Sequence, residues 1–206
     1  MYGVIRIYKM KSAAKDIDKV VAATRDGFLP IVTKMPGFAS YTMALSETGE
    51  LVTIGFFLDR ADAEESTRLA GEWVCDNVMW AVEGPPKTAG GEVRLQERLG
   101  HEASYGTVRR GKLQPGKMNE ALALMRRELL PLLSSMPGFV TVAILESGPD
   151  EFLSVAAWRD RASAEEATRH AMAFLERSAA ELVAGPPEML DGELLLRRVN
   201  EPAIKS

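Results

Sequence analysis

The sequence has one cysteine, two histidines and no long apolar run, and each scarcity removes a class of protein. Cys75 alone cannot form an internal disulfide, and with only His101 and His170 a metal site built from histidine and cysteine is excluded. No apolar stretch approaches the roughly 18 residues that cross a bilayer, and the first residues alternate where a signal peptide has a hydrophobic block. We therefore expect a cytoplasmic protein with no metal site and no membrane partner.

Charge and glycine patterns narrow the partners further. The 206 residues include 25 basic and 29 acidic side chains, a formal net charge of −4, and no basic run of the kind that binds nucleic acid. Neither the dinucleotide-binding glycine pattern nor a phosphate-binding loop occurs, so no nucleotide cofactor is expected. Hydrophobic residues make up 46% of the chain, enough for a core. The remaining partner is a small hydrophobic or aromatic molecule, or none.

The same residue pattern occurs twice along the chain. The tetrapeptide MPGF at 35–38 recurs at 136–139, a shift of 101 positions, and the same shift relates DRA at 59–61 to DRA at 160–162. Such self-similarity at a fixed period is typical of duplicated structural units. The sequence therefore predicts two homologous domains, residues 1–98 and residues 103–206.

Within each repeat the hydrophobic periodicity changes in a fixed order. In the first repeat it predicts a strand over 2–10, a helix over 17–32, strands over 38–45 and 51–58 joined by a hairpin, a helix over 63–82 and a strand over 92–95. Pro30 and Pro131 fall late in the first helix of each repeat, where they predict a kink. The order β-α-β-β-α-β is that of the ferredoxin-like unit, whose helices cover one sheet face. Two units can cover each other's bare faces, which predicts an α+β fold with the sheets packed together.

An acidic motif opens the second helix of each repeat. Asp62 with Glu65, and Ser163 with Glu166, have the spacing of a capping box, so we interpret these residues as helix-start structure and not as a catalytic carboxylate cluster.

The residues quoted above, with the run LVTIGFFLDRADAEEST at 51–67, its counterpart FLSVAAWRDRASAEEAT at 152–168, and GPP before each last strand, carry a family resemblance. The chain resembles the antibiotic biosynthesis monooxygenase domain of the dimeric α/β barrel superfamily, once per repeat. The resemblance implies two ferredoxin-like βαββαβ domains packed as an intramolecular dimeric α/β barrel. Its members include cofactor-independent oxygenases of polyketide quinols and haem-degrading oxygenases. It assigns no catalytic residue in this chain.

Alternation along the strands suggests a ligand pocket. If Ile5 faces the helices, Arg6 and Tyr8 face the opposite side, toward an interior between the domains, and Arg109 repeats this placement in the second copy. The same reasoning places Phe57 and Trp158 of the third strands in that interior. An arginine beside aromatic side chains can hold a carboxylate or stabilise a phenolate. The alternative is that the arginines form a salt bridge between the domains or lie at an open rim.

His170 takes the position that Leu69 has in the first repeat, on the apolar stripe of the second helix. A histidine there is commonly a partly buried, hydrogen-bonded residue; the functional alternatives are a base for a phenolic substrate or a haem ligand.

Three functions therefore stay open. The first is a cofactor-independent monooxygenase that acts on a small aromatic or quinol-type molecule. The second is a non-catalytic module that binds a small molecule or is associated with stress. The third is a haem-binding or haem-degrading oxygenase, which depends on His170. The two domains are expected to pair within the chain, and a further homo-oligomer stays open.

Overall fold

A computed structural model describes residues 1–11, 16–100 and 102–200, so His101 lies outside the described residues. The fold is α+β, and the same order of elements occurs twice. The first set comprises β1 (Tyr2–Lys9), α1 (Ile17–Ala23), the π-helical turn η1 (Thr24–Phe28), α2 (Leu29–Val32), β2 (Phe38–Ser46), β3 (Glu50–Phe57), α3 (Arg60–Asn77) and β4 (Lys87–Arg98). The second comprises β5 (Tyr105–Lys112), α4 (Met118–Leu124), η2 (Met125–Leu129), α5 (Leu130–Ser134), β6 (Phe139–Gly148), β7 (Glu151–Trp158), α6 (Arg161–Ser178) and β8 (Glu188–Val199). The β-α-β-β-α-β order predicted for each half is confirmed.

The chain forms two compact units, one of residues 1–90 with 194–206 and one of residues 91–193. β4 and β8 each begin in one unit and end in the other. The second part of β4 pairs with β6, and after the end of β8 the amide of Asn200 donates to the carbonyl of Ala39, 2.8 Å away. The predicted domains 1–98 and 103–206 are units of sequence, and they differ from these compact units by the ends of two strands. Those boundaries stay a prediction.

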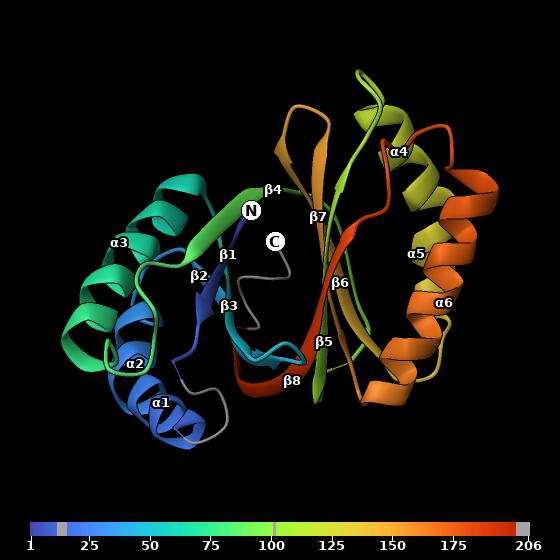
Figure 1. The fold of residues 1–206 in the computed structure, drawn as a ribbon. Helices are drawn as coiled ribbons and strands as arrows, with labels where there is room; N and C mark the ends of the chain where they lie inside the picture. Colours follow the sequence, from blue (N-terminus) through green and yellow to red (C-terminus); the bar gives the residue numbers. More distant parts are fainter. Residues whose placement is uncertain (12–15, 101, 201–206) are drawn as a thin grey trace. The chain divides into compact units, whose positions relative to one another are not determined.

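The sheet of the first unit has β3 at its centre, paired antiparallel with β1 and with β2. The β2–β3 turn places Gly49 at φ 84°, a conformation that glycine adopts without strain, as the predicted hairpin requires. The helices α1, α2 and α3 lie against one face of these strands (Figure 1). The apolar cluster of this unit lies between that face and the helices; it includes Val20, Phe28 and Ala70 from the helical side.

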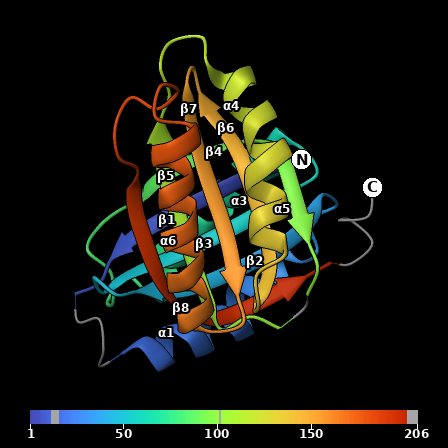
Figure 2. The ribbon, with the colours of Figure 1, turned by 90° about the vertical axis from the view of Figure 1, so that its right-hand side faces the viewer.

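The second unit has the strand order β8-β5-β7-β6-β4, with all neighbours antiparallel. The helices α5 and α6 lie across one face of β7 and its neighbours (Figure 2). Their apolar cluster includes Leu129, Leu133 and Phe174 and reaches Trp158 on the sheet. Each unit therefore has its own core between one sheet face and its helices.

Each first helix is interrupted by a π-helical turn directly before its proline. η1 ends two residues before Pro30, and η2 ends two residues before Pro131. Proline has no amide hydrogen and its ring crowds the carbonyl four residues earlier, so the wider π turn accommodates it without ending the helix. The prediction of a kink or second helical piece is confirmed in this form.

The helices α3 and α6 begin one turn earlier than the sequence analysis predicts. The N-caps are Asp59 and Asp160, whose carboxylates accept hydrogen bonds from the amides of Asp62 and Ser163. The capping box assigned to Asp62 and Ser163 is therefore wrong in register, although the motif does start the helix. The sequence alone does not distinguish the two aspartates of DRAD, because aspartate is common both at N-caps and in turns.

The Asp59 cap provides a stability prediction. Replacing Asp59 by alanine leaves the amide of Asp62 without its acceptor, 2.9 Å away in the parent, and should lower the free energy of unfolding by about 1 kcal/mol. Asparagine at the same position keeps the acceptor and should cost much less. Urea unfolding followed by circular dichroism measures both; equal losses in the two variants would contradict the capping role.

Candidate functional site

The strand residues proposed for a pocket lie on the helix side of each sheet. Arg6 donates hydrogen bonds to Ser66 and Thr67 of α3, and Arg109 donates to Thr168 of α6. Ile5 is equally buried but is absent from the cluster beneath the helices. The predicted facing is therefore wrong: Arg6, Tyr8, Phe57, Arg109 and Trp158 face their own helices.

The cause of the reversed facing is that these strands are buried on both sides. Alternation identifies two faces but does not say which one meets the helices when both are apolar. The prediction started from the condition that Ile5 faces the helices. The hydroxyl groups of Ser66 and Thr67 on α3, however, provide the acceptors that a buried guanidinium needs.

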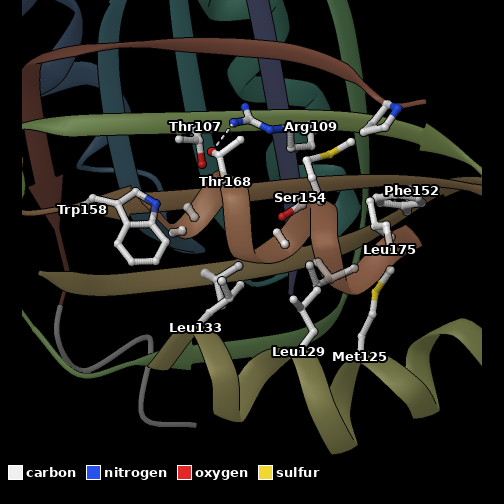
Figure 3. Close-up of a pocket in the computed structure, with 17 residues that line it drawn as sticks. Thr107, Arg109, Met125, Leu129, Leu133, Phe152, Ser154, Trp158, Thr168 and Leu175 are labelled. Atoms are coloured by element: carbon white, nitrogen blue, oxygen red, sulfur yellow. Dashed lines mark hydrogen bonds between the residues drawn. The ribbon is translucent and has the colours of Figure 1, made fainter. Parts of the chain in front are cut away.

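The second unit has a cavity between its sheet and its helices, with about 680 Å³ of empty space including the part open to solvent. Its apolar wall comes from β6, β7, η2, α5 and α6. Met125, Leu129 and Leu133 point into it from the helical side, and Trp158 closes one end (Figure 3). Trp158 is only 2% exposed and packs edge-on against Phe139, with ring centroids 5.5 Å apart. The π turn η2 thus supplies two wall residues, as π turns at functional sites often do.

The polar groups of this cavity gather near β5 and the adjoining turn of α6 (Figure 3). Thr107, Ser154, Thr168 and Arg109 line it there. The Arg109 guanidinium donates through Nη2 to Thr168 Oγ1 at 2.9 Å, and it forms a two-point ion pair with the carboxylate of Asp191 on β8. The salt bridge that the sequence analysis held as the alternative is present, but within one unit. The charge facing the cavity is therefore largely neutralised.

The corresponding cavity of the first unit is smaller, with about 370 Å³ of empty space including its open part. Aromatic side chains occupy its wall at positions where the second repeat has smaller residues. When the repeats are aligned, residues of the first repeat correspond to residues of the second as follows: Tyr41 to Val142, Phe28 to Leu129, Trp73 to Phe174 and Tyr8 to Gly111. Phe28 packs against both Tyr41 and Trp73, with ring centroids 5.7 Å apart in each pair. The two units therefore have the same order of elements, but the cavity of the first unit is smaller than that of the second.

Arg6 is 1% exposed and has no carboxylate partner among the described residues. Its Nη2 donates to Ser66 Oγ at 2.7 Å and to Thr67 Oγ1 at 2.8 Å, while Nε is buried without any acceptor. Burial lowers the pKa of this guanidinium, and burial likewise raises the pKa values of the Tyr8 and Tyr41 hydroxyls nearby. Both phenols are therefore neutral at physiological pH and leave the arginine charge uncompensated.

The remaining candidates are placed differently. Phe57 is fully buried and packs edge-on against Phe38, with ring centroids 6.3 Å apart, so it belongs to the core. His170 was expected on the apolar stripe of its helix, but it is exposed and its Nε2 lies 3.0 Å from Glu166 Oε1. It does not line the cavity of the second unit. The helical position assigned to it was misjudged because Leu69, its counterpart, is itself only half-buried.

Two features of the site escaped the sequence analysis. Asp191, the partner of Arg109, lies in the last strand, for which the sequence analysis predicts no site residue. Tyr41, which narrows the first cavity, was treated as an ordinary strand residue. Aligning the repeats would have revealed both, because Asp191 corresponds to Gly90 and Tyr41 to Val142.

The described residues provide neither a metal-binding cluster nor a helix that could cross a membrane. Within residues 1–11, 16–100 and 102–200, no group of three or more His, Cys, Asp or Glu side chains could hold a metal ion. No helix in this same part of the chain has the length and hydrophobicity needed to cross a membrane.

A comparison with known families tests the family resemblance that the sequence analysis describes. The family model described as antibiotic biosynthesis monooxygenase matches residues 104–175, which include β5, η2, β6, β7 and most of α6. The resemblance to this family is therefore shown for residues 104–175. This family segment contains Arg109, Trp158 and Thr168 of the cavity. A search of curated proteins finds no match to the chain.

Solved structures resemble the whole chain in fold. A candidate monooxygenase from Fusobacterium nucleatum has a TM-score of 0.75 at 10% sequence identity, covering 97% of this chain and 94% of that one. An anthrone oxidase-like protein has a TM-score of 0.62 at 16% identity, covering 96% and 92%. A haem-degrading enzyme from Listeria monocytogenes has a TM-score of 0.53 at 8% identity, covering 94% and 99%. At these identities the likeness establishes the fold alone. This likeness, together with the β-α-β-β-α-β order found twice in the chain, confirms the predicted α+β fold of the dimeric α/β barrel type.

Proposed function

We propose that this protein is an oxygenase of the antibiotic biosynthesis monooxygenase type, which acts on a small aromatic quinol bound in the cavity of the second unit. The observation that carries the proposal is the cavity itself, an apolar space with one polar end, inside the family segment. Binding sites of this kind hold a flat hydrophobic molecule and orient it through a few polar groups.

The residues suggest how a quinol would lie in this cavity. Its rings would contact Leu129, Leu133 and Trp158, and its hydroxyl groups would point to Ser154 and Arg109. Because Arg109 is already paired with Asp191, the polar end favours a neutral quinol over a substrate that arrives as an anion. Arg109 Nε makes no hydrogen bond within the described residues, and so a donor remains for negative charge that develops during the reaction.

The proposed reaction uses molecular oxygen as the oxidant. A 1,4-hydroquinone with a free ring position gives up two O–H hydrogens and its ring C–H bond is replaced by C–OH. One atom of O₂ enters the new C–O bond, and the other leaves as water with two hydrogens, so quinol and O₂ give hydroxyquinone and water. The protein's part is to bind the quinol in a site of low water content and to stabilise the phenolate that reacts with O₂.

The experiment is oxygen uptake by the purified full chain with 1,4-naphthohydroquinone under ¹⁸O₂. We expect uptake above the rate without protein, and mass spectrometry should find one ¹⁸O atom in 2-hydroxy-1,4-naphthoquinone. Spontaneous oxidation instead gives 1,4-naphthoquinone and hydrogen peroxide without label, which distinguishes the two routes. If the quinol raises the melting temperature of the protein but no labelled product forms, the protein is a binding module and the oxygenase proposal fails.

A further inference from the structure

Among the residues that the structure describes, the Arg6 guanidinium of the first unit is buried without a counter-charge. The exposed fraction of the residue is 1%, and its two hydrogen-bond acceptors, Ser66 and Thr67, are neutral hydroxyl groups. Both hydroxyls also donate to the carbonyl of Ala63, at 2.8 and 3.0 Å, so they are satisfied by the helix itself. An uncompensated buried cation costs several kcal/mol in a protein interior. A group of opposite charge is therefore missing from this site.

The second unit identifies the position of the missing group. There Arg109 donates to Thr168, the counterpart of Thr67, and pairs with the carboxylate of Asp191. The residue at the position of Asp191 in the first repeat is Gly90, which has no side chain. A Cβ atom at Gly90 would lie 2.8 Å from the backbone oxygen of Gly3, so the local backbone leaves no room for an aspartate there. The first unit therefore keeps the arginine and the threonine but not the carboxylate.

A hollow lies beside Gly90, the residue that corresponds to Asp191. It has about 520 Å³ of empty space, mostly open to solvent, and both Thr67 and Gly90 line it, together with Val4 and Ala63. Thr67 Oγ1 is one hydrogen bond from Arg6. The acidic residue at this hollow, Glu64, is held by Arg60 through a 2.7 Å ion pair. Arg6 does not itself line the hollow, and Thr67, which accepts its hydrogen bond, is the lining residue in contact with the guanidinium. A ligand in the hollow would therefore reach the guanidinium at its Thr67 side.

We propose that the first unit binds a carboxylate ligand in this hollow, with its carboxylate group on Arg6 in the place that Asp191 takes on Arg109. A planar carboxylate matches the fork of guanidinium N–H groups. Asp191 pairs with Nη1 and Nη2 of Arg109, and on Arg6 the Nη1 group has no acceptor among the described residues while Nη2 donates to the two hydroxyls. This site is separate from the quinol cavity of the second unit, so the two proposals stand or fall independently.

The test is calorimetric titration of the full chain with benzoate, and with benzamide as an uncharged molecule of the same shape. We expect one benzoate per chain and affinity for benzamide at least about tenfold weaker, because charge-assisted pairs are the stronger ones. Arg6→Met should weaken benzoate binding at least about tenfold, and Arg6→Lys, which keeps the charge but loses the planar fork, should weaken it less. Equal binding of benzoate and benzamide, or benzoate binding unchanged in Arg6→Met, would overturn the proposal.

The second unit supplies a matched gain of binding. Asp191→Gly reproduces around Arg109 the arrangement that Gly90 creates around Arg6, so this variant should bind two benzoates per chain. The double variant Arg6→Met with Asp191→Gly should bind one. The single variant Asp191→Gly does not depend on whether Arg6→Met folds, and a stoichiometry that stays at one in Asp191→Gly contradicts the assignment.

Discussion

Tyrosine in place of Val142 is expected to reduce oxygen uptake with 1,4-naphthohydroquinone at least about 100-fold. Val142 is fully buried and lines the cavity of the second unit, whereas the same position of the first repeat holds Tyr41. The introduced phenol extends into the space in which the quinol rings would lie. Excluding the substrate removes all the binding energy that its rings contribute, so catalysis and binding are lost together. Oxygen electrode traces with parent and variant measure the effect.

The first unit provides the control for that variant. In Tyr41→Val the cavity opened lies in the first unit, and uptake should stay within about twofold of the parent, because the site of the reaction is unchanged. Circular dichroism should show that Val142→Tyr folds, since Thr53 interacts with the hydroxyl of Tyr41 and Ser154 stands at the corresponding place in the second unit. Activity that survives in Val142→Tyr and disappears in Tyr41→Val would place the reaction in the first unit.

The order of helices and strands was predictable because the two repeats show the same succession of hydrophobic periodicities, so each predicted element has a counterpart in the other repeat. The strands of the hairpins agree with the structure to within one residue at each end. The second helix was predicted to continue to residue 82, but α3 ends at Asn77, whose side chain donates to the carbonyl of Trp73. Apolar residues beyond this point continue the helical spacing, but the backbone of Val78, with φ −133° and ψ 13°, has already left the helical conformation. Periodicity reports which residues are buried, but not where the backbone leaves the helix.

The residues of the site were recognisable, and their arrangement was not. Arg109 and Trp158 line one cavity, but this cavity lies between the sheet and the helices of the second unit and not between the domains, where the alternation had predicted it. The face on which they lie could not be read from alternation, because both faces of the strands are buried. The ion pair with Asp191 joins residues 82 positions apart, and no local pattern signals a contact of that range. A functional difference between the repeats can be predicted from the sequence only at positions where the two copies differ in the size or the charge of the side chain.

Methionine at Arg6 and methionine at Arg109 are expected to change stability in opposite directions. Arg6→Met removes an unpaired buried charge, and the hydroxyls it leaves still donate to Ala63, so the free energy of unfolding should rise by about 1–2 kcal/mol. Arg109→Met leaves the carboxylate of Asp191 without its partner, and the free energy of unfolding should fall by about 1–2 kcal/mol, since Asp191 is partly exposed and water compensates some of the loss. Urea unfolding measures both.

The sign of the Arg6 effect tests what the residue is for. A side chain selected for stability lowers the free energy of the folded state, so its replacement by an apolar residue of similar length destabilises the fold. A side chain kept in spite of its cost performs some other task, as strained or poorly compensated groups at binding sites do. Benzoate at saturating concentration should reverse the order, because the ligand stabilises the parent and not Arg6→Met. If Arg6→Met is less stable than the parent both with and without benzoate, Arg6 is a structural residue and its two hydroxyl contacts account for its burial.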